Sequence, residues 1–186
     1  MRKQTHLTII LASLLACGII ACGGAKKTDT EDPAQQQTSA SATEQAEHYM
    51  GMAGMAISEG KDQEALANYL AAAEIYDREG VVTVERAEAH FLAADILYKL
   101  TEHVQAIEEY EKSVEIYTRF SGNAQIKAAN ALNNMGTIYK ELLKKSRAVD
   151  CWTRALEIYK SAPKELQNEA NMQMIQQNIR DLEQGF

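Results

Sequence analysis

The chain has 186 residues, of which 46% are hydrophobic and 24% are charged, an ordinary globular composition for about one domain. Its 19 lysines and arginines against 26 aspartates and glutamates give a net charge of −7. No basic stripe that could neutralise phosphates stands out, so the composition excludes nucleic acid as the expected partner. We interpret the densest basic stretch, residues 140–147, as a solvated face.

The N-terminus has the features of a targeting segment. Arg2 and Lys3 form a positive head, and the apolar run from Leu7 to Ala21 is shorter than the ~20 residues that cross a bilayer as a helix. We therefore predict a signal peptide over residues 1–21.

The end of this run resembles the lipobox of bacterial lipoproteins, once before Cys17 (LLAC) and once before Cys22 (IIAC). Cys22 is the favoured site because polar sequence follows it, whereas the residues after Cys17 are still apolar. The resemblance implies a lipid on Cys22 and anchoring in the bacterial envelope. Because Gly23 and not Asp follows, we expect the outer membrane, facing the periplasm. A plain secretory peptide is the alternative.

After Cys22 the chain becomes polar and small. Residues 23–43 contain no aromatic or large aliphatic side chain and consist of Gly, Ala, Ser, Thr, Gln, Pro and charged residues. Such a segment cannot bury enough apolar surface to order itself, so we predict that residues 22–43 are a flexible tether.

The tripeptide Glu-Ile-Tyr occurs three times, ending at Tyr76, Tyr117 and Tyr159, with separations of 41 and 42 residues. A period of about 20–50 residues is typical of repeat architectures. The segments between these sites have apolar residues at helical spacing and few helix breakers. The pattern therefore predicts an all-α chain of repeated helix pairs.

Alignment on this tripeptide brings small and large residues into register, and the pattern resembles the tetratricopeptide repeat. Small residues recur where two helices cross, followed by an aromatic position: Ala53, Ala94 and Gly136; Ala65, Ala106 and Ala148; Tyr69, Tyr110 and Trp152. Gly60 matches the glycine between the two helices, whereas Thr101 and Leu143 replace it later, and His90 replaces a bulky residue. The long period resembles the kinesin-light-chain-like branch.

The resemblance implies an α-solenoid of three helix–turn–helix repeats over residues 44–162 and a C-terminal capping helix over residues 163–186. In the last segment the apolar residues share one stripe: Met172, Ile175, Ile179 and Leu182. A terminal helix with one wet face is what a solenoid needs at its end.

Little in the sequence points to catalysis. No phosphate loop or nucleophile elbow is present, and no histidine lies at ligand spacing from another histidine or a cysteine. Glu44 and His48 could hold a metal, but a surface pair on a helix explains them better. Cys151 is interpreted as a small, partly buried residue, with an intermolecular disulfide as the alternative. We therefore expect neither an enzyme nor a cofactor.

A binding surface is expected on the first helix of each repeat, which lines the concave face of such solenoids. The residues predicted to line this groove are Met50, Phe91, Asp95, Tyr98, Asn130, Asn133, Asn134 and Thr137. The resemblance implies that Asn134 grips the backbone of a bound peptide, since an amide both donates and accepts. Alternatively, the tether or the last helix covers these residues. Glu109, on the second helix, is expected to lie away from the groove.

The sequence thus predicts a membrane-anchored adaptor that binds a protein partner at the bacterial envelope. A second hypothesis is a self-associating structural lipoprotein in which the face around Trp152 and Cys151 joins two copies. A third is a metal-binding protein or enzyme that uses Glu44 and His48.

Overall fold

The computed structural model describes residues 33–185, with side chains described from residue 41 onward. These residues belong to one compact unit, Asp32–Phe186. The predicted signal peptide and Cys22 lie outside the described residues. Within the described part, no helix is both long enough and apolar enough to span a membrane.

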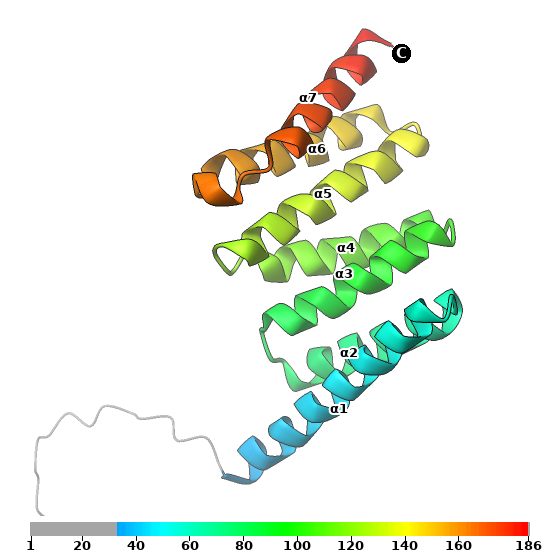
Figure 1. Cartoon of the computed structure of the whole chain (residues 1–186), viewed down its shortest axis with the longest axis vertical. Helices are drawn as coiled ribbons and strands as arrows, with labels where there is room; N and C mark the ends of the chain where they lie inside the picture. The colour runs from blue at the N-terminus through cyan, green and yellow to red at the C-terminus, as the bar shows by residue number, and fades with distance from the viewer. Residues whose placement is uncertain (1–32, 186) are drawn as a thin grey trace, which may run out of the picture. The chain divides into compact units, whose positions relative to one another are not determined.

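The described chain is all-α and forms three successive helix pairs followed by a last helix (Figure 1). The predicted tetratricopeptide-like α-solenoid is confirmed. The helices are α1 (Pro33–Ser58), α2 (Asp62–Glu79), α3 (Val84–Lys99), α4 (His103–Tyr117), α5 (Asn123–Glu141), α6 (Lys145–Ser161) and α7 (Glu169–Gln184), with a 3-10 turn, η1 (Lys164–Leu166), before α7.

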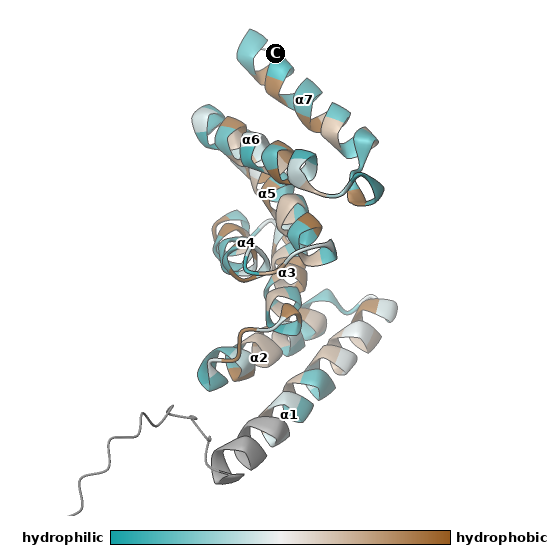
Figure 2. Cartoon of the chain, turned by 90° about the vertical axis from the view of Figure 1, so that its left-hand side faces the viewer, coloured by the Kyte–Doolittle hydropathy of each residue, from teal (hydrophilic) through white to brown (hydrophobic). Residues whose placement is uncertain are grey.

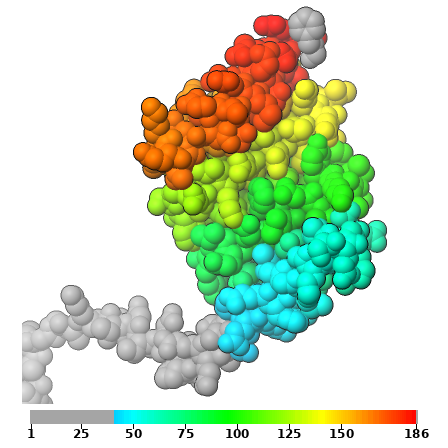
Figure 3. All heavy atoms as spheres, viewed as in Figure 1, coloured from blue at the N-terminus to red at the C-terminus, as the bar shows by residue number. Residues whose placement is uncertain are grey.

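The helices lie in two layers. In the turned view α1, α3, α5 and α7 lie on one side and α2, α4 and α6 on the other (Figure 2). We call the first set helices A and the second helices B. Each helix B packs against the helix A before it and the helix A after it. The stacked pairs form a continuous body in chain order (Figure 3).

Helix α1 begins at Pro33, earlier than the predicted start of the first repeat at residue 44. Ala42 and Ala46 are buried in a cluster with Ala72 and Tyr76 of α2, so α1 already packs on α2 two residues before the predicted start. The stretch of residues 33–43 resembles a linker in composition but is helical. Helix α1 therefore begins within the segment predicted to be a flexible tether, and residues 22–32 of that segment lie outside the described residues.

The turn from helix A to helix B is the same in all three repeats. Its central residue has a left-handed backbone, with φ of 74° at Gly60, 65° at Thr101 and 57° at Leu143. In each repeat the next residue's amide closes the turn onto the preceding helix: Lys61 to Ala56 (2.9 Å), Glu102 to Leu97 (2.8 Å) and Lys144 to Tyr139 (2.8 Å). This is the Schellman geometry that glycine favours. The expectation for Gly60 is confirmed, and the later repeats keep the turn without glycine.

The close helix crossings predicted from the small residues are present. Ala106, Ala148 and Trp152 are completely buried. A Cβ atom on Gly136 would lie 2.4 Å from Nε1 of Trp152, so only glycine fits against this ring. The indole Nε1 donates to the carbonyl oxygen of Asn133 at 3.2 Å, which fixes the ring across α5.

Helix α7 begins at Glu169 and not at Pro163 as predicted, because η1 and an extended residue precede it. The Asn168 side chain caps the helix by accepting from the amide of Asn171 at 3.0 Å. The predicted apolar stripe is confirmed: Met172 and Ile175 are buried, and Ile179 and Leu182 are half-buried against the core.

Candidate functional site

The tyrosines that end the Glu-Ile-Tyr tripeptides reach from helices B toward the polar side of helices A. The hydroxyl of Tyr117 donates to Glu88 Oε2 at 2.6 Å, and that of Tyr159 donates to Asn130 Oδ1. Burial and the Glu88 carboxylate both raise the pKa of Tyr117. In the first repeat, the hydroxyl of Tyr76 is buried without a hydrogen-bond partner among the described residues.

Asp95, Tyr110 and Asn134 form a second polar cluster, which joins repeats two and three. The Tyr110 hydroxyl donates to Asp95 Oδ1, and Asn134 Nδ2 lies 3.0 Å from the Tyr110 oxygen and 3.3 Å from Asp95 Oδ1. Burial raises the pKa of Asp95, although the hydrogen bonds from Tyr110 and Asn134 oppose the shift. The structure thus brings together two residues predicted to line the groove.

Two further contacts connect α3 to α5 on the same side. Tyr98 donates to Glu141 Oε1 at 2.7 Å, and this hydrogen bond, with burial, raises the pKa of Tyr98 to about 12. Lys127 forms an ion pair with Glu88. We call the surface formed by these contacts the helix-A surface; its residues are Glu88, Asp95, Tyr98, Lys127, Asn134 and Glu141.

The other predicted groove residues lie at or beside this surface in different roles. Phe91 is half-buried and packs edge-on against Tyr110, with ring centroids 5.6 Å apart. It therefore packs against the tyrosine of the Asp95–Tyr110–Asn134 cluster. Met50 is half-buried on α1 and packs against the core of the first repeat.

Asn133 and Thr137 lie on the same side of α5. Thr137 Oγ1 donates to the Asn133 carbonyl at 3.2 Å. The side-chain Oδ1 of Asn133 is buried with no hydrogen-bond partner in the described part of the chain. Because this oxygen is buried, it is not offered to an outside partner as the half-buried Asn134 side chain can be.

The helix-A surface is suited to binding a polypeptide backbone. The Asn134 amide nitrogen is engaged by Asp95 and Tyr110, which orients the side chain and leaves its oxygen to accept from a peptide N–H. The neighbouring carboxylates of Asp95 and Glu88 accept further hydrogen bonds. The sequence pattern identified Asp95 and Asn134 but missed Tyr110, whose only signal was its place as the aromatic of helix B.

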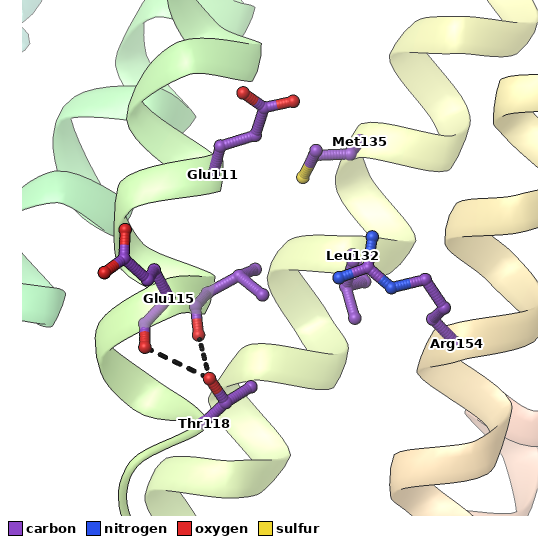
Figure 4. A pocket seen from close by; sticks show the side chains of 7 residues that line it. Glu111, Glu115, Thr118, Leu132, Met135 and Arg154 are labelled. Atoms are coloured by element: carbon purple, nitrogen blue, oxygen red, sulfur yellow. Dashed lines mark hydrogen bonds between the residues drawn. The ribbon is translucent and has the colours of Figure 1, made fainter.

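A hollow lies on the opposite side, between α4 and α6 (Figure 4). It has a volume of about 410 Å³, with Glu111 and Glu115 on the α4 side, Arg154 on the α6 side, and Leu132 and Met135 of α5 as its floor. We call it the helix-B groove. Its walls carry opposite charges, and the sequence analysis did not predict it.

Trp152 and Cys151 do not form an exposed face. Trp152 is completely buried and Cys151 is buried as well. Burial raises the pKa of the Cys151 thiol to about 11, which keeps it protonated and unreactive near neutral pH. The prediction that these two residues join two copies is therefore wrong for the folded chain.

Glu109 is not a neutral position on an outer face. It is buried, and its Oε2 lies 2.6 Å from Nδ1 of His90, whose Nε2 lies 3.1 Å from Asp77 Oδ1. Burial alone would raise the pKa of Glu109, but hydrogen bonds from His90 and Lys112 outweigh it and lower the pKa. His90 thus joins α2, α3 and α4 through carboxylates, which explains a histidine where a bulky apolar residue was expected.

Glu44 and His48 are both exposed on α1. Among the described residues, no group of three His, Cys, Asp or Glu side chains is arranged to hold a metal ion.

Part of the chain matches a known protein family. The tetratricopeptide repeat family model matches residues 85–161, which span the second and third helix pairs. The first pair, which the family model does not cover, has the same helix order and the same turn geometry. A tetratricopeptide-repeat domain indicates protein binding and is typically a non-catalytic scaffold. No curated protein sequence matches the chain.

Solved structures share the tetratricopeptide-repeat fold at low sequence identity. BtubC (BKLC) from P. vanneervenii, a kinesin-light-chain-like protein, has a TM-score of 0.65 at 20% identity over 75% of this chain. The N-terminal domain of stress-induced protein-1 from C. elegans gives 0.58 at 17% over 76%, and the Arabidopsis OM64 TPR domain 0.56 at 18% over 75%. The match covers 97% and 98% of the last two chains but only 55% of BtubC.

Proposed function

We propose that the protein is a membrane-anchored adaptor of the bacterial envelope that binds an extended peptide segment of a protein partner on the helix-A surface. The observation that carries this proposal is the Asp95–Tyr110–Asn134 cluster, which orients polar side chains at the junction of two tetratricopeptide repeats. The family match over residues 85–161 supports a protein partner.

The chemistry of the surface favours a peptide backbone over a small molecule. The helix-A surface carries amide and carboxylate groups on α3 and α5. A peptide backbone has alternating N–H donors and C=O acceptors that can form hydrogen bonds with these groups. Because the helices hold these groups rigidly, the partner and not the adaptor loses conformational freedom on binding.

The anchor rests on the sequence, since Cys22 lies outside the described residues. Lipidation of Cys22 would hold the domain at the membrane. Replacing Cys22 with Ala should release the protein from membranes, whereas Cys17→Ala should not. Membrane fractionation and the intact mass of the mature protein check both expectations. A mature chain without acyl mass on Cys22 would remove the anchor from the proposal.

The binding site is tested with a partner recovered from detergent-solubilised membranes and identified by mass spectrometry. Asn134→Ala should weaken binding about five- to a hundredfold, because an unpaired peptide group in a desolvated groove costs ~1–3 kcal/mol. Circular dichroism checks that the variant folds.

Two matched variants make the result specific. Tyr110→Phe disturbs the same cluster from a position that is completely buried, so it should weaken binding less than Asn134→Ala. Glu111→Ala changes the helix-B groove and should leave binding unchanged. If Glu111→Ala weakens binding and Asn134→Ala does not, the helix-B groove is the binding surface and the proposal is wrong.

A further inference from the structure

The turn between α5 and α6 holds a leucine in an unfavourable place. Leu143 has a φ of 57°, a left-handed conformation that glycine adopts easily and a residue with a Cβ does not. Gly60 occupies the equivalent position in the first repeat. The backbone hydrogen bonds of the turn do not require a leucine, because all three repeats form them with different residues.

The Leu143 side chain gains nothing from the fold in return for this strain. It is 91% exposed, the most exposed large apolar side chain among the described residues. The strain at Leu143 therefore has no compensating contact among the described residues.

The surroundings of Leu143 are basic. Four cationic side chains, Lys140, Lys144, Lys145 and Arg147, are exposed around the turn. Within the described chain none of the four forms an ion pair: Lys145 reaches the Glu183 carbonyl at 3.4 Å, and Arg147 lies over the Tyr139 ring at 5.6 Å.

Cations near the first two turns behave differently. Lys61 pairs with Glu59 at 2.6 Å, and Lys99 pairs with Asp62 at 2.7 Å. The carboxylate nearest to Leu143 in sequence, Glu141, accepts from Tyr98 and lies 3.7 Å from His103. The third turn is therefore a local positive site on a chain whose net charge is −7.

We propose that the α5–α6 turn docks onto an anionic lipid surface, with Leu143 entering the apolar boundary and Lys140, Lys144, Lys145 and Arg147 facing the headgroups. Long lysine and arginine side chains can place their charges at headgroup level while the leucine enters. A protein partner would need a complementary surface of about 800 Å² on each side, and one projecting turn does not offer it. A bilayer needs no such fit and attracts each basic residue separately.

This inference goes beyond the proposed adaptor function and does not depend on the lipid at Cys22. Headgroup attraction and one apolar side chain together give weak, reversible binding, comparable to that of a single acyl chain. Its effect is to orient the domain against a membrane surface.

The test measures co-sedimentation of the full chain with vesicles of phosphatidylglycerol and phosphatidylcholine in equal parts, and with vesicles of phosphatidylcholine alone. The N-terminal segment is the same in every variant, so differences between variants report on the turn. Wild-type protein should bind the anionic vesicles more strongly, and added salt should reduce the difference because it screens exposed charges.

Leu143→Gly should weaken binding to anionic vesicles about tenfold. It should also raise the melting temperature by about 2 °C, because it relieves the left-handed leucine. Leu143→Asn, which tolerates this backbone and is polar, should weaken binding similarly. Lys144→Glu combined with Lys145→Glu should weaken it at least about thirtyfold, from about fivefold per charge.

Thr101→Gly is the matched control, because it relieves the same strain in the second repeat without touching the basic turn. It should leave vesicle binding unchanged. The proposal fails if wild-type protein does not prefer anionic vesicles, or if Thr101→Gly weakens binding as much as Leu143→Gly. It also fails if charge reversal weakens binding while Leu143→Gly does not, since the leucine then enters no membrane.

Discussion

The first repeat and the two that follow it share one architecture but differ in their polar contacts. In repeats two and three the hydroxyls of Tyr117 and Tyr159 are hydrogen-bonded to helices A, whereas that of Tyr76 is buried without a partner in the described chain. On α1, residues 49–58 contain no charged side chain. The first helix pair therefore forms without a hydrogen bond from its tyrosine hydroxyl. This favours a role for the hydrogen bonds of Tyr117 and Tyr159 at the surface rather than in specifying the fold.

The comparison also separates two kinds of small residue. Gly136 in the third repeat faces the Trp152 ring, where a Cβ would lie 2.4 Å away, while a Cβ on Gly54 in the first repeat would meet nothing within 4 Å. Both glycines are in helices A, so the same substitution tests opposite expectations.

The largest expected effect is that of Gly136→Ala, which should lower the free energy of unfolding by about 3 kcal/mol, because the buried indole cannot move aside. Gly54→Ala should instead raise it by about 0.5–1 kcal/mol, since alanine favours a helix interior. Urea denaturation measures both changes. Equal effects at the two positions would mean that Gly136 does not lie at a tight crossing.

A smaller difference in unfolding free energy is expected between variants that remove the hydroxyls of Tyr117 and Tyr76. Tyr117→Phe removes a hydrogen bond to the Glu88 carboxylate and should cost about 1.5–2 kcal/mol of unfolding free energy. Tyr76→Phe removes a buried hydroxyl without a partner and should be neutral or stabilising, by up to about 1 kcal/mol. Thermal and urea unfolding of both variants measure the two changes in stability. If Tyr76→Phe destabilises the protein as much as Tyr117→Phe does, the expected difference between the two hydroxyls is wrong.

The smallest effect concerns the junction between the first two repeats, where His90 contacts Asp77 and Glu109. Glu109→Gln should cost about 1 kcal/mol at pH 7, a modest value because the glutamine oxygen can still accept one of the two hydrogen bonds. The pKa of Glu109 is lowered in the folded protein, so its contribution is present above its unfolded pKa and is lost as the pH falls through the folded value.

The stability difference between wild type and Glu109→Gln should therefore shrink as the pH falls below about 4. Unfolding measured over a series of pH values checks this. A difference that is independent of pH would mean that the carboxylate contributes through packing and not through its charge.

The repeat architecture could be predicted from the sequence because the period is carried by residues in the core. Ala106 and Ala148 recur at one position, and the large ring of Trp152 recurs at another, because each helix crossing needs a small residue opposite a large one. The left-handed turn at Gly60 was equally predictable, since glycine is the residue that favours it.

Other features could not be predicted because they depend on contacts between distant segments. Ala42 is buried against α2 ahead of the predicted start at residue 44, and composition does not reveal this contact. Helical spacing placed Asp95 and Asn134 on one side of their helices, but the hydroxyl of Tyr110 that joins them comes from a third helix. Glu109 was misplaced because its partner, His90, belongs to another helix.

Helix α7 occupies the place that the first helix of a fourth repeat would take. Tyr159 donates to Asn130, and Nδ2 of Asn171 in α7 lies 3.4 Å from the same hydroxyl, much as Lys127 in α5 and Tyr117 both reach Glu88. If one repeat were duplicated in tandem, the last helix B would present α7 with a surface like that of α6, on which α7 already packs. The domain can therefore change length in evolution by whole repeats, with α7 as an end piece that need not be redesigned.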